Sequence, residues 1–231
     1  MRTTLLSGLL LFAMLLIGCG GGDGKPVRAV SDDPVIRDVM SVLLNDTGVP
    51  VAATTADAAT SFIFDDELPV SPLNVEAFAS QVVSELGSSL SEAFPDHAST
   101  IDANAAAYLD ELVKLDAYGK ATMNRVPEDN RTVTDERIAP MAVYGITVSS
   151  DGQEVDGLYL DGPADERIES TYLGMMDHNF TILAAKLGAQ GVDVHGLTAQ
   201  LTLGHNHDHG HGGHDDDHEG HDHGDHEGHD H

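Results

Sequence analysis

The last 27 residues, His205 to His231, constrain the fold most strongly because they contain no apolar side chain. Eleven of them are His, nine are Asp or Glu, six are Gly and one is Asn. A segment of this composition buries too little apolar surface to offset the entropy of ordering, so we expect it to stay disordered when free. Any hydrophobic core must therefore come from the residues before this His-rich tail.

The side chains of the tail predict metal binding. Neutral imidazole and carboxylate groups are ligands for Zn²⁺, and also for Ni²⁺, Cu²⁺, Co²⁺ and Mn²⁺. Here they recur every two or three residues, which offers several overlapping sets of four ligands. The candidate imidazole ligands are His205, His207, His209, His211, His214, His218, His221, His223, His226, His229 and His231. The alternatives are a solvated acidic tail or a purification tag, although Asp and Gly interrupt what in a tag is usually an unbroken His run.

The first residues indicate export and lipid anchoring. Arg2, an apolar run and the sequence Leu-Ile-Gly-Cys ending at Cys19 resemble a bacterial lipoprotein signal, with residues 1–18 removed and Cys19 lipidated. The apolar run is too short for a membrane span, which needs ~20 residues. Residues 19–26 are then a flexible tether, and we expect an extracytoplasmic protein held at the membrane by its lipid. Since Cys19 is the only Cys, metal ligands must be His, Asp or Glu.

The charge and the absence of catalytic motifs narrow the function further. The formal net charge is −28, and the acidic residues of the tail account for −9 of it. Such a field repels nucleic acid and anionic lipid headgroups and attracts cations. The chain has no HExxH motif and no Gly-rich phosphate loop, and its His, Ser and Asp residues do not suggest a hydrolase. We therefore expect a metal-ion binding protein rather than an enzyme or a nucleic-acid partner.

Residues 27–203 predict one α/β domain, in which helices cover parallel strands. Short apolar runs predict strands at 27–30, 49–53, 131–134, 146–149 and 155–160. Helical spacing predicts helices from Pro34 to Gly48, from an N-cap at Ser71 to Phe94, from an N-cap at Ser99 to Asn124, over 136–143 and over 166–187. On the third helical stretch, Glu111 is expected on the polar side. The expected apolar face of the last stretch is Tyr172, Met175, Met176, Phe180, Leu183 and Leu187. His97 and His178 are expected at the surface.

Three segments resemble the zinc and manganese ABC-transporter solute-binding lipoproteins. They are SPLNVEAFASQVVSEL, FPDHASTIDANAAAYLDELVKLDAYGKATMNRVPEDNRTV and STYLGMMDHNFTILAAKLG, and they follow one another in the order of the family. The resemblance implies two α/β lobes joined by a long helix, one metal bound between the lobes by His, Glu and Asp, and a membrane permease as partner. The chain departs from the pattern at its N-terminal lobe, where residues 25–69 replace a much longer region.

The same resemblance places the ligands of the cleft. The first His of the family has no counterpart, and the second falls on Glu67. The third falls near Thr134, on Asp135 or Glu136, and the fourth on Asp161. Such an all-oxygen site suits Mn²⁺, Mg²⁺ or Ca²⁺ better than Zn²⁺. The alternative is that these carboxylates only cap helices and line a solvated cleft.

Two functions remain open. The protein is either a reduced receptor that delivers zinc to a permease, or a lipid-anchored metal buffer whose folded domain has no working cleft.

Overall fold

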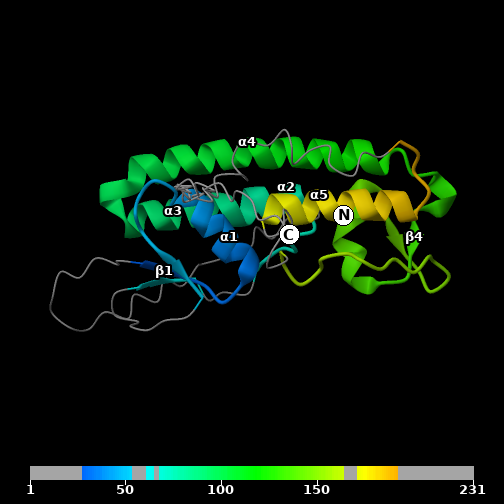
Figure 1. The fold of residues 1–231 in the computed structure, drawn as a ribbon, viewed down its shortest axis with the longest axis horizontal. Helices are drawn as coiled ribbons and strands as arrows, with labels where there is room; N and C mark the ends of the chain where they lie inside the picture. Colours follow the sequence, from blue (N-terminus) through cyan, green and yellow to red (C-terminus); the bar gives the residue numbers. More distant parts are fainter. Residues whose placement is uncertain (1–27, 54–60, 65–67, 164–170, 192–231) are drawn as a thin grey trace, which may run out of the picture.

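The long helix α4 (Ala98–Met123) runs along most of the molecule in the computed structural model, and the other elements lie on one side of it (Figure 1). The structure describes residues 28–53, 61–64, 68–163 and 171–191. A small sheet and three helical segments form an N-terminal lobe near one end of α4, and short strands and a 3₁₀ helix form a C-terminal lobe near the other. This confirms the predicted α/β class and the long connecting helix.

The N-terminal lobe begins with a strand, a helix and a second strand, as predicted. Strand β1 (Arg28–Val30) lies in the centre of a parallel sheet, between β2 (Val51–Ala52) and β3 (Ser61–Ile63). Helix α1 (Pro34–Leu43) connects β1 to β2 and buries an apolar face. Its N-cap is Asp33, whose Oδ1 accepts hydrogen bonds from the amides of Val35 and Ile36 at 2.7 and 3.0 Å.

The next helical stretch starts later than the sequence predicted. It consists of α2 (Val75–Phe78), a π-helical turn η2 (Ala79–Val83) and α3 (Ser84–Ala93), and it ends at Phe94 as expected. The predicted N-cap at Ser71 is wrong. The Ser71 hydroxyl instead accepts from the Leu73 amide at 3.2 Å within a preceding turn, and Asn74 caps α2 by accepting from the Ala77 amide.

Helix α4 follows a short 3₁₀ turn, η3 (Pro95–His97), and the expected N-cap at Ser99 is also wrong. Ser99 lies inside the first turn of α4, and His97 takes the capping position without a side-chain hydrogen bond. Asp102, three residues after Ser99, accepts a hydrogen bond from the Ser91 hydroxyl of α3 at 2.6 Å. Glu111 is only 4% exposed, contrary to the expected polar side, and its carboxylate lies 3.0 Å from the Lys114 ammonium.

The C-terminal lobe contains two short parallel strands, β4 (Thr132–Val133) and β5 (Thr147–Val148), separated by the 3₁₀ helix η5 (Glu136–Tyr144). A one-turn 3₁₀ helix, η4 (Glu128–Asn130), precedes β4. These elements confirm the strands and the helix predicted between 131 and 149. The predicted strand at 155–160 is wrong, because no strand forms there among the described residues.

Helix α5 (Tyr172–Lys186) packs along α4 and explains why residues 155–160 are not a strand. At Tyr159, the Asn179 side chain makes the backbone hydrogen bonds that a neighbouring strand would make in a sheet. Its Oδ1 accepts from the Tyr159 amide and its Nδ2 donates to the Tyr159 carbonyl, both at 2.8 Å. The helix begins after Thr171, whose hydroxyl accepts from the Gly174 amide at 3.1 Å. The predicted start at 166 lies outside the described residues.

One hydrophobic core joins the two lobes through α4 and α5. Tyr172, Met175, Met176, Phe180, Leu183 and Leu187, predicted as the apolar face of the closing helix, are all buried in it. Helices α4 and α5 approach each other closely at Gly119, where a Cβ would lie 2.3 Å from the Phe180 ring. Among the described residues, no helix combines the length and the apolar character that a membrane span requires.

Candidate metal-binding region

The structure describes only part of the predicted metal ligands. The His-rich tail, Glu67 and the lipidation residue Cys19 lie outside the described residues. The two candidates for the third ligand, Asp135 and Glu136, and the candidate fourth ligand, Asp161, can be placed. All three belong to the C-terminal lobe.

Asp135 lies between β4 and η5 and is the N-cap of η5. Its Oδ1 accepts a hydrogen bond from the Arg137 amide at 3.0 Å. The Arg137 guanidinium donates to the same carboxylate, from Nε to Oδ1 at 3.1 Å and from Nη2 to Oδ2 at 2.7 Å. These hydrogen bonds from Arg137 lower the pKa of Asp135 below its usual value. Asp135 therefore caps a helix, which is the alternative considered for it, while Glu136 is the exposed first residue of η5.

Asp161 lies at the end of the segment that Asn179 holds against α5. Its side chain is 94% exposed, and one oxygen lies 3.9 Å from Nη1 of Arg137. The next residue, Gly162, has φ +129°, and a Cβ there would lie 2.6 Å from Cγ of Pro34. This contact brings the turn that carries Asp161 against the first residue of α1, so Asp161 lies where the two lobes meet.

The candidate carboxylates therefore come close to one another, but around a guanidinium. Asp135 and Asp161 lie on different sides of Arg137, at 2.7 and 3.9 Å from its nitrogens. Within residues 28–53, 61–64, 68–163 and 171–191, no three His, Cys, Asp or Glu side chains are grouped so that they could hold a metal ion. In the arrangement described, these two carboxylates do not match the coordination that a divalent cation requires.

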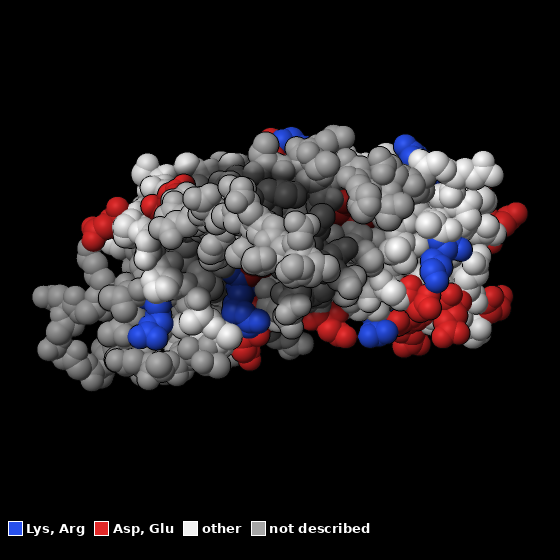
Figure 2. All heavy atoms as spheres, in the orientation of Figure 1, with Lys and Arg blue, Asp and Glu red and all other residues white. Residues whose placement is uncertain are grey.

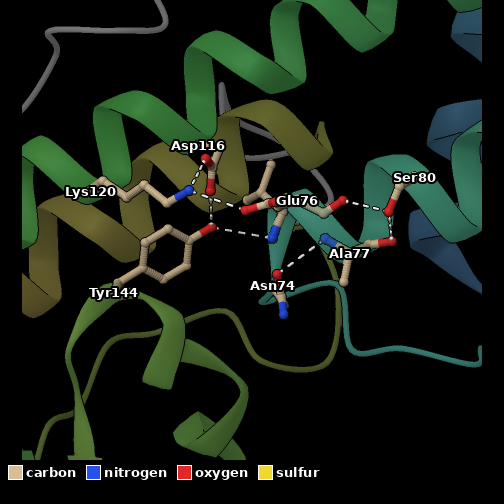
Figure 3. Close-up of polar contacts among 8 residues, drawn as sticks. Asn74, Glu76, Ala77, Ser80, Asp116, Lys120 and Tyr144 are labelled. Carbon is tan, nitrogen blue, oxygen red and sulfur yellow. Dashed lines mark hydrogen bonds and ion pairs between the residues drawn. The ribbon is translucent and has the colours of Figure 1, made fainter. Parts of the chain in front are cut away.

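A polar network connects α2, α4 and η5 (Figure 3). The Tyr144 hydroxyl, at the end of η5, accepts from the Val75 amide at 3.2 Å and donates to Oδ1 of Asp116 on α4 at 3.1 Å. The Lys120 ammonium bridges Oδ2 of Asp116 at 2.6 Å and Oε2 of Glu76 at 3.2 Å. The start of α2, the middle of α4 and the end of η5 are thus held together.

Burial raises the pKa of the Tyr144 hydroxyl well above its usual value, and the charge of Asp116 adds to the effect. The hydroxyl therefore stays protonated and continues to donate to Asp116 at any physiological pH. Tyr144 therefore links the start of α2 and the end of η5 to α4.

Tyr172 makes a second connection between the lobes. Its amide donates to Oδ2 of Asp38 on α1 at 2.8 Å, across 134 residues of sequence. Its hydroxyl donates to the Pro72 carbonyl at 2.7 Å, and its ring packs on Phe78 with a centroid separation of 4.6 Å. Helical spacing in the sequence predicted Tyr172 only as part of an apolar face. Its phenolic hydroxyl was the available signal, because a buried Tyr usually finds a polar partner.

The two histidines among the described residues, His97 and His178, are half-buried rather than fully exposed. Nε2 of His178 lies 2.8 Å from the Gly157 carbonyl, and its ring lies 4.7 Å from the Tyr159 ring. His178 thus helps Asn179 to hold the segment that leads to Asp161. His97 occupies the N-cap position of α4. Neither belongs to a group of possible metal ligands within the described part of the chain.

Comparisons with known proteins agree with the resemblance found in the sequence. Residues 64–141 match the family model described as zinc-uptake complex component A, periplasmic. The fold is similar to that of the periplasmic zinc binding protein TroA from Treponema pallidum, with a TM-score of 0.60 and 17% sequence identity. That similarity covers 71% of this chain and 99% of the other. No curated protein matches the chain. Both findings agree with the predicted relationship to the metal solute-binding proteins of ABC transporters.

Proposed function

We propose that this relative of the ABC-transporter metal-binding proteins is an extracytoplasmic lipoprotein that binds zinc and delivers it to a membrane permease. The observation that carries the proposal is the match of residues 64–141 to a zinc-uptake component, in a chain that also ends in eleven closely spaced histidines. The fold of the known periplasmic zinc binding protein supports it. Zinc is the cargo, and the tail gathers it.

The His-rich tail supplies most of the metal capacity. Imidazole is a good ligand for Zn²⁺, and the same groups also accept Mn²⁺, Ni²⁺, Cu²⁺ and Co²⁺. The high negative charge of the chain favours the approach of cations over anions. Lipidation of Cys19 keeps the protein near the permease, which receives the metal.

Calorimetric titration with Zn²⁺ tests this proposal. The full mature chain is compared with a chain that ends at Gly204 and with a full-length chain in which every tail His is replaced by Gln. The last variant keeps the length and the carboxylates of the tail, so it isolates the imidazoles. We expect both altered chains to lose most of their Zn²⁺ stoichiometry. Equal stoichiometry in all three would refute zinc capture by the tail.

A metal buffer is the second candidate function, and the position of Arg137 favours it. The guanidinium satisfies Asp135 and approaches Asp161, so these residues need no metal in the arrangement described. Uptake of radioactive zinc by cells that lack the protein distinguishes the two functions. A receptor predicts slower uptake when zinc is scarce, whereas a buffer predicts normal uptake and lower tolerance of excess zinc.

Membrane attachment is tested separately. Replacing Cys19 by Ser removes the lipidation site, and we expect the protein to move from the membrane fraction to the soluble fraction. Replacement of the neighbouring Gly20 by Ser is the matched control and is expected to remain membrane-bound. Retention of the Cys19→Ser variant in the membrane would contradict the proposed anchor.

A further inference from the structure

Helix α4 has a second contact face, on the side that points away from the lobes. The other labelled helices and strands lie on one side of α4 (Figure 1). Exposed residues on the other side recur at spacings of four, three, four, three and four. These are the spacings of the a and d positions of a coiled coil, where two helices meet. The residues of this outer seam are Ala103, Ala107, Asp110, Lys114, Ala117 and Ala121.

The outer seam is more apolar than a solvent-exposed helix face usually is. Such a face normally carries charged and polar side chains, whereas the seam has Ala at its outer positions and charges only at the middle two. Val113 lies beside the seam and is 65% exposed, the most of any large apolar side chain among the described residues. Leu112, on the opposite side of the helix, is buried in the core of the protein itself. Both sides of α4 are therefore suited to packing.

We propose that the outer seam joins two copies of this chain into a symmetric, antiparallel dimer, with α4 packed against α4. In a two-fold interface, residue i of one copy contacts residue j of the other, and j contacts i. An axis at the level of Leu112 pairs each seam residue with another at the same distance from that position. The pairs are Ala103 with Ala121, Ala107 with Ala117, and Asp110 with Lys114. Val113 lies next to the axis and contacts Val113 of the second copy.

The two central charges select the direction of the helices. In the antiparallel arrangement each Asp110 carboxylate faces a Lys114 ammonium of the second copy, and symmetry makes this contact twice. In a parallel pair, Asp110 would face Asp110 and Lys114 would face Lys114, and such like-charge contacts disfavour an interface. Within one copy the Lys114 ammonium lies 3.2 Å from the Asp110 carboxylate, and the two side chains are 52% and 72% exposed. Both can therefore reach a second copy.

The charge of the lobes favours the same direction. Acidic side chains gather, together with a few basic ones, at the surface of the C-terminal lobe on the face that Figure 2 shows. The two lobes lie near opposite ends of α4. An antiparallel pair therefore places each C-terminal lobe beside the N-terminal lobe of the second copy. A parallel pair would bring the two acidic surfaces side by side, where like charges repel.

The size of the seam predicts a weak dimer. From Ala103 to Ala121 the helix is about 27 Å long and about 10 Å wide, which gives a contact smaller than the ~1,200 Å² that stable interfaces bury. Ala side chains allow the two helix axes to approach to about 8 Å, but the net charge of −28 on each chain makes the copies repel each other. We expect a dissociation constant between about 10 and 100 µM, since even standard-size interfaces can be only micromolar.

Sedimentation equilibrium of the full mature chain tests the dimer. A salt concentration of about 0.15 M gives a Debye length of about 8 Å, which screens the lobes from each other more than it screens charges in contact at the seam. A chelator keeps metal from linking the tails of two chains. Asp110→Lys leaves only ammonium groups at the centre and should weaken the dimer about tenfold or more. Glu154→Lys, an equal change of charge at an exposed residue outside α4, is the matched control and should not weaken it.

Disulfide trapping tests the direction of the helices. Ala107→Cys and Ala117→Cys are made separately in the mature chain with Cys19→Ser, and each is oxidised alone and mixed with the other. The antiparallel pair brings these two positions together, within the ~3.5–4.5 Å between Cβ atoms that a disulfide needs. A covalent dimer should therefore form mainly in the mixture. Ala103→Cys mixed with Ala107→Cys is the control, because these positions of the two copies lie about 21 Å apart along the helix axis.

Three results would each overturn the proposal. The first is a monomer at every concentration up to about 1 mM, where a dimer with a dissociation constant of about 100 µM would predominate. The second is equal weakening by Asp110→Lys and Glu154→Lys. The third is a covalent dimer that forms as readily from one cysteine variant alone, or from the control mixture, as from the mixture of Ala107→Cys with Ala117→Cys. None of these measurements involves zinc, so they stand whether or not the protein delivers metal to a permease.

Discussion

Replacing Gly119 by Ala tests whether α4 and α5 pack as closely as the structure shows. A Cβ on Gly119 would lie 2.3 Å from Cζ of Phe180 and 2.7 Å from two further ring carbons. Carbon atoms in contact prefer separations of ~3.5–4.0 Å, so the ring would have to move by more than 1 Å. The ring has little room, because it is fully buried and packs edge-on against Tyr144 at 4.8 Å.

Two effects of opposite sign decide the outcome. Ala stabilises a helix interior by about 0.8–1.0 kcal/mol relative to Gly. Overpacking a tight core costs about 1–3 kcal/mol, and three ring contacts under 3.0 Å place Gly119 at the upper part of that range. We therefore expect the Gly119→Ala variant to lose about 1–2 kcal/mol of its free energy of unfolding. For a chain of this size that corresponds to a melting temperature lower by about 2–8 °C.

Gly87→Ala in α3 is the matched control. It has the same propensity gain in a helix interior, but its Cβ would meet only the Cβ of Ala105, at 3.1 Å. Urea unfolding followed by circular dichroism measures both variants, since the chain has no Trp for fluorescence. A chelator keeps metal bound by the tail from altering stability.

A double-mutant cycle with Phe180→Leu then identifies the clash. The smaller side chain should relieve the contact, so the two substitutions together should be less destabilising than the sum of the two by about 1 kcal/mol. If Gly119→Ala is as stable as the unchanged protein, or more stable, the close packing of α4 on α5 is wrong.

Three further predictions concern the hydrogen bonds of Asn179, the Tyr144 hydroxyl and the His-rich tail. Asn179→Leu should destabilise the protein by about 2–4 kcal/mol, since it removes both the acceptor for the Tyr159 amide and the donor to the Tyr159 carbonyl. Hydrogen exchange at the Tyr159 amide should rise sharply, and unchanged protection would contradict the clamp. Tyr144→Phe should lower the free energy of unfolding, measured in urea, by about 1–3 kcal/mol, because the Val75 amide loses its acceptor. A change below about 0.5 kcal/mol, which is the scatter of surface substitutions, would show that the hydroxyl does not hold α2. The His-rich tail should release its metal as pH falls through about 6 to 5, because imidazoles with a pKa near ~6.5 then become protonated. Metal bound by carboxylates would stay bound to about pH 4. A constant number of bound metal ions per chain from about pH 7.5 to about pH 5 would exclude imidazole ligands.

Local patterns in the sequence predicted most of the secondary structure. The βαβ start, the extent of α4 and the buried face of α5 follow from apolar spacing within a few turns, and the structure confirms them. The errors lie where several local signals compete. Ser71 and Ser99 both have the residue type of an N-cap. A turn precedes α2 and a 3₁₀ segment precedes α4, so the two helices begin at other residues than these serines predicted.

The sequence by itself determined the composition of the tail, and that composition is the basis for predicting that the tail binds metal and forms no core. Only the tertiary structure decided where the carboxylates of the folded domain lie. Asp135 pairs with Arg137, two residues further along the chain, whereas Asp161 approaches the same guanidinium from a segment that Asn179 on α5 holds in place. Spacing along the chain cannot predict such a meeting. It depends on how helices pack across more than a hundred residues, as the hydrogen bond from Tyr172 to Asp38 does.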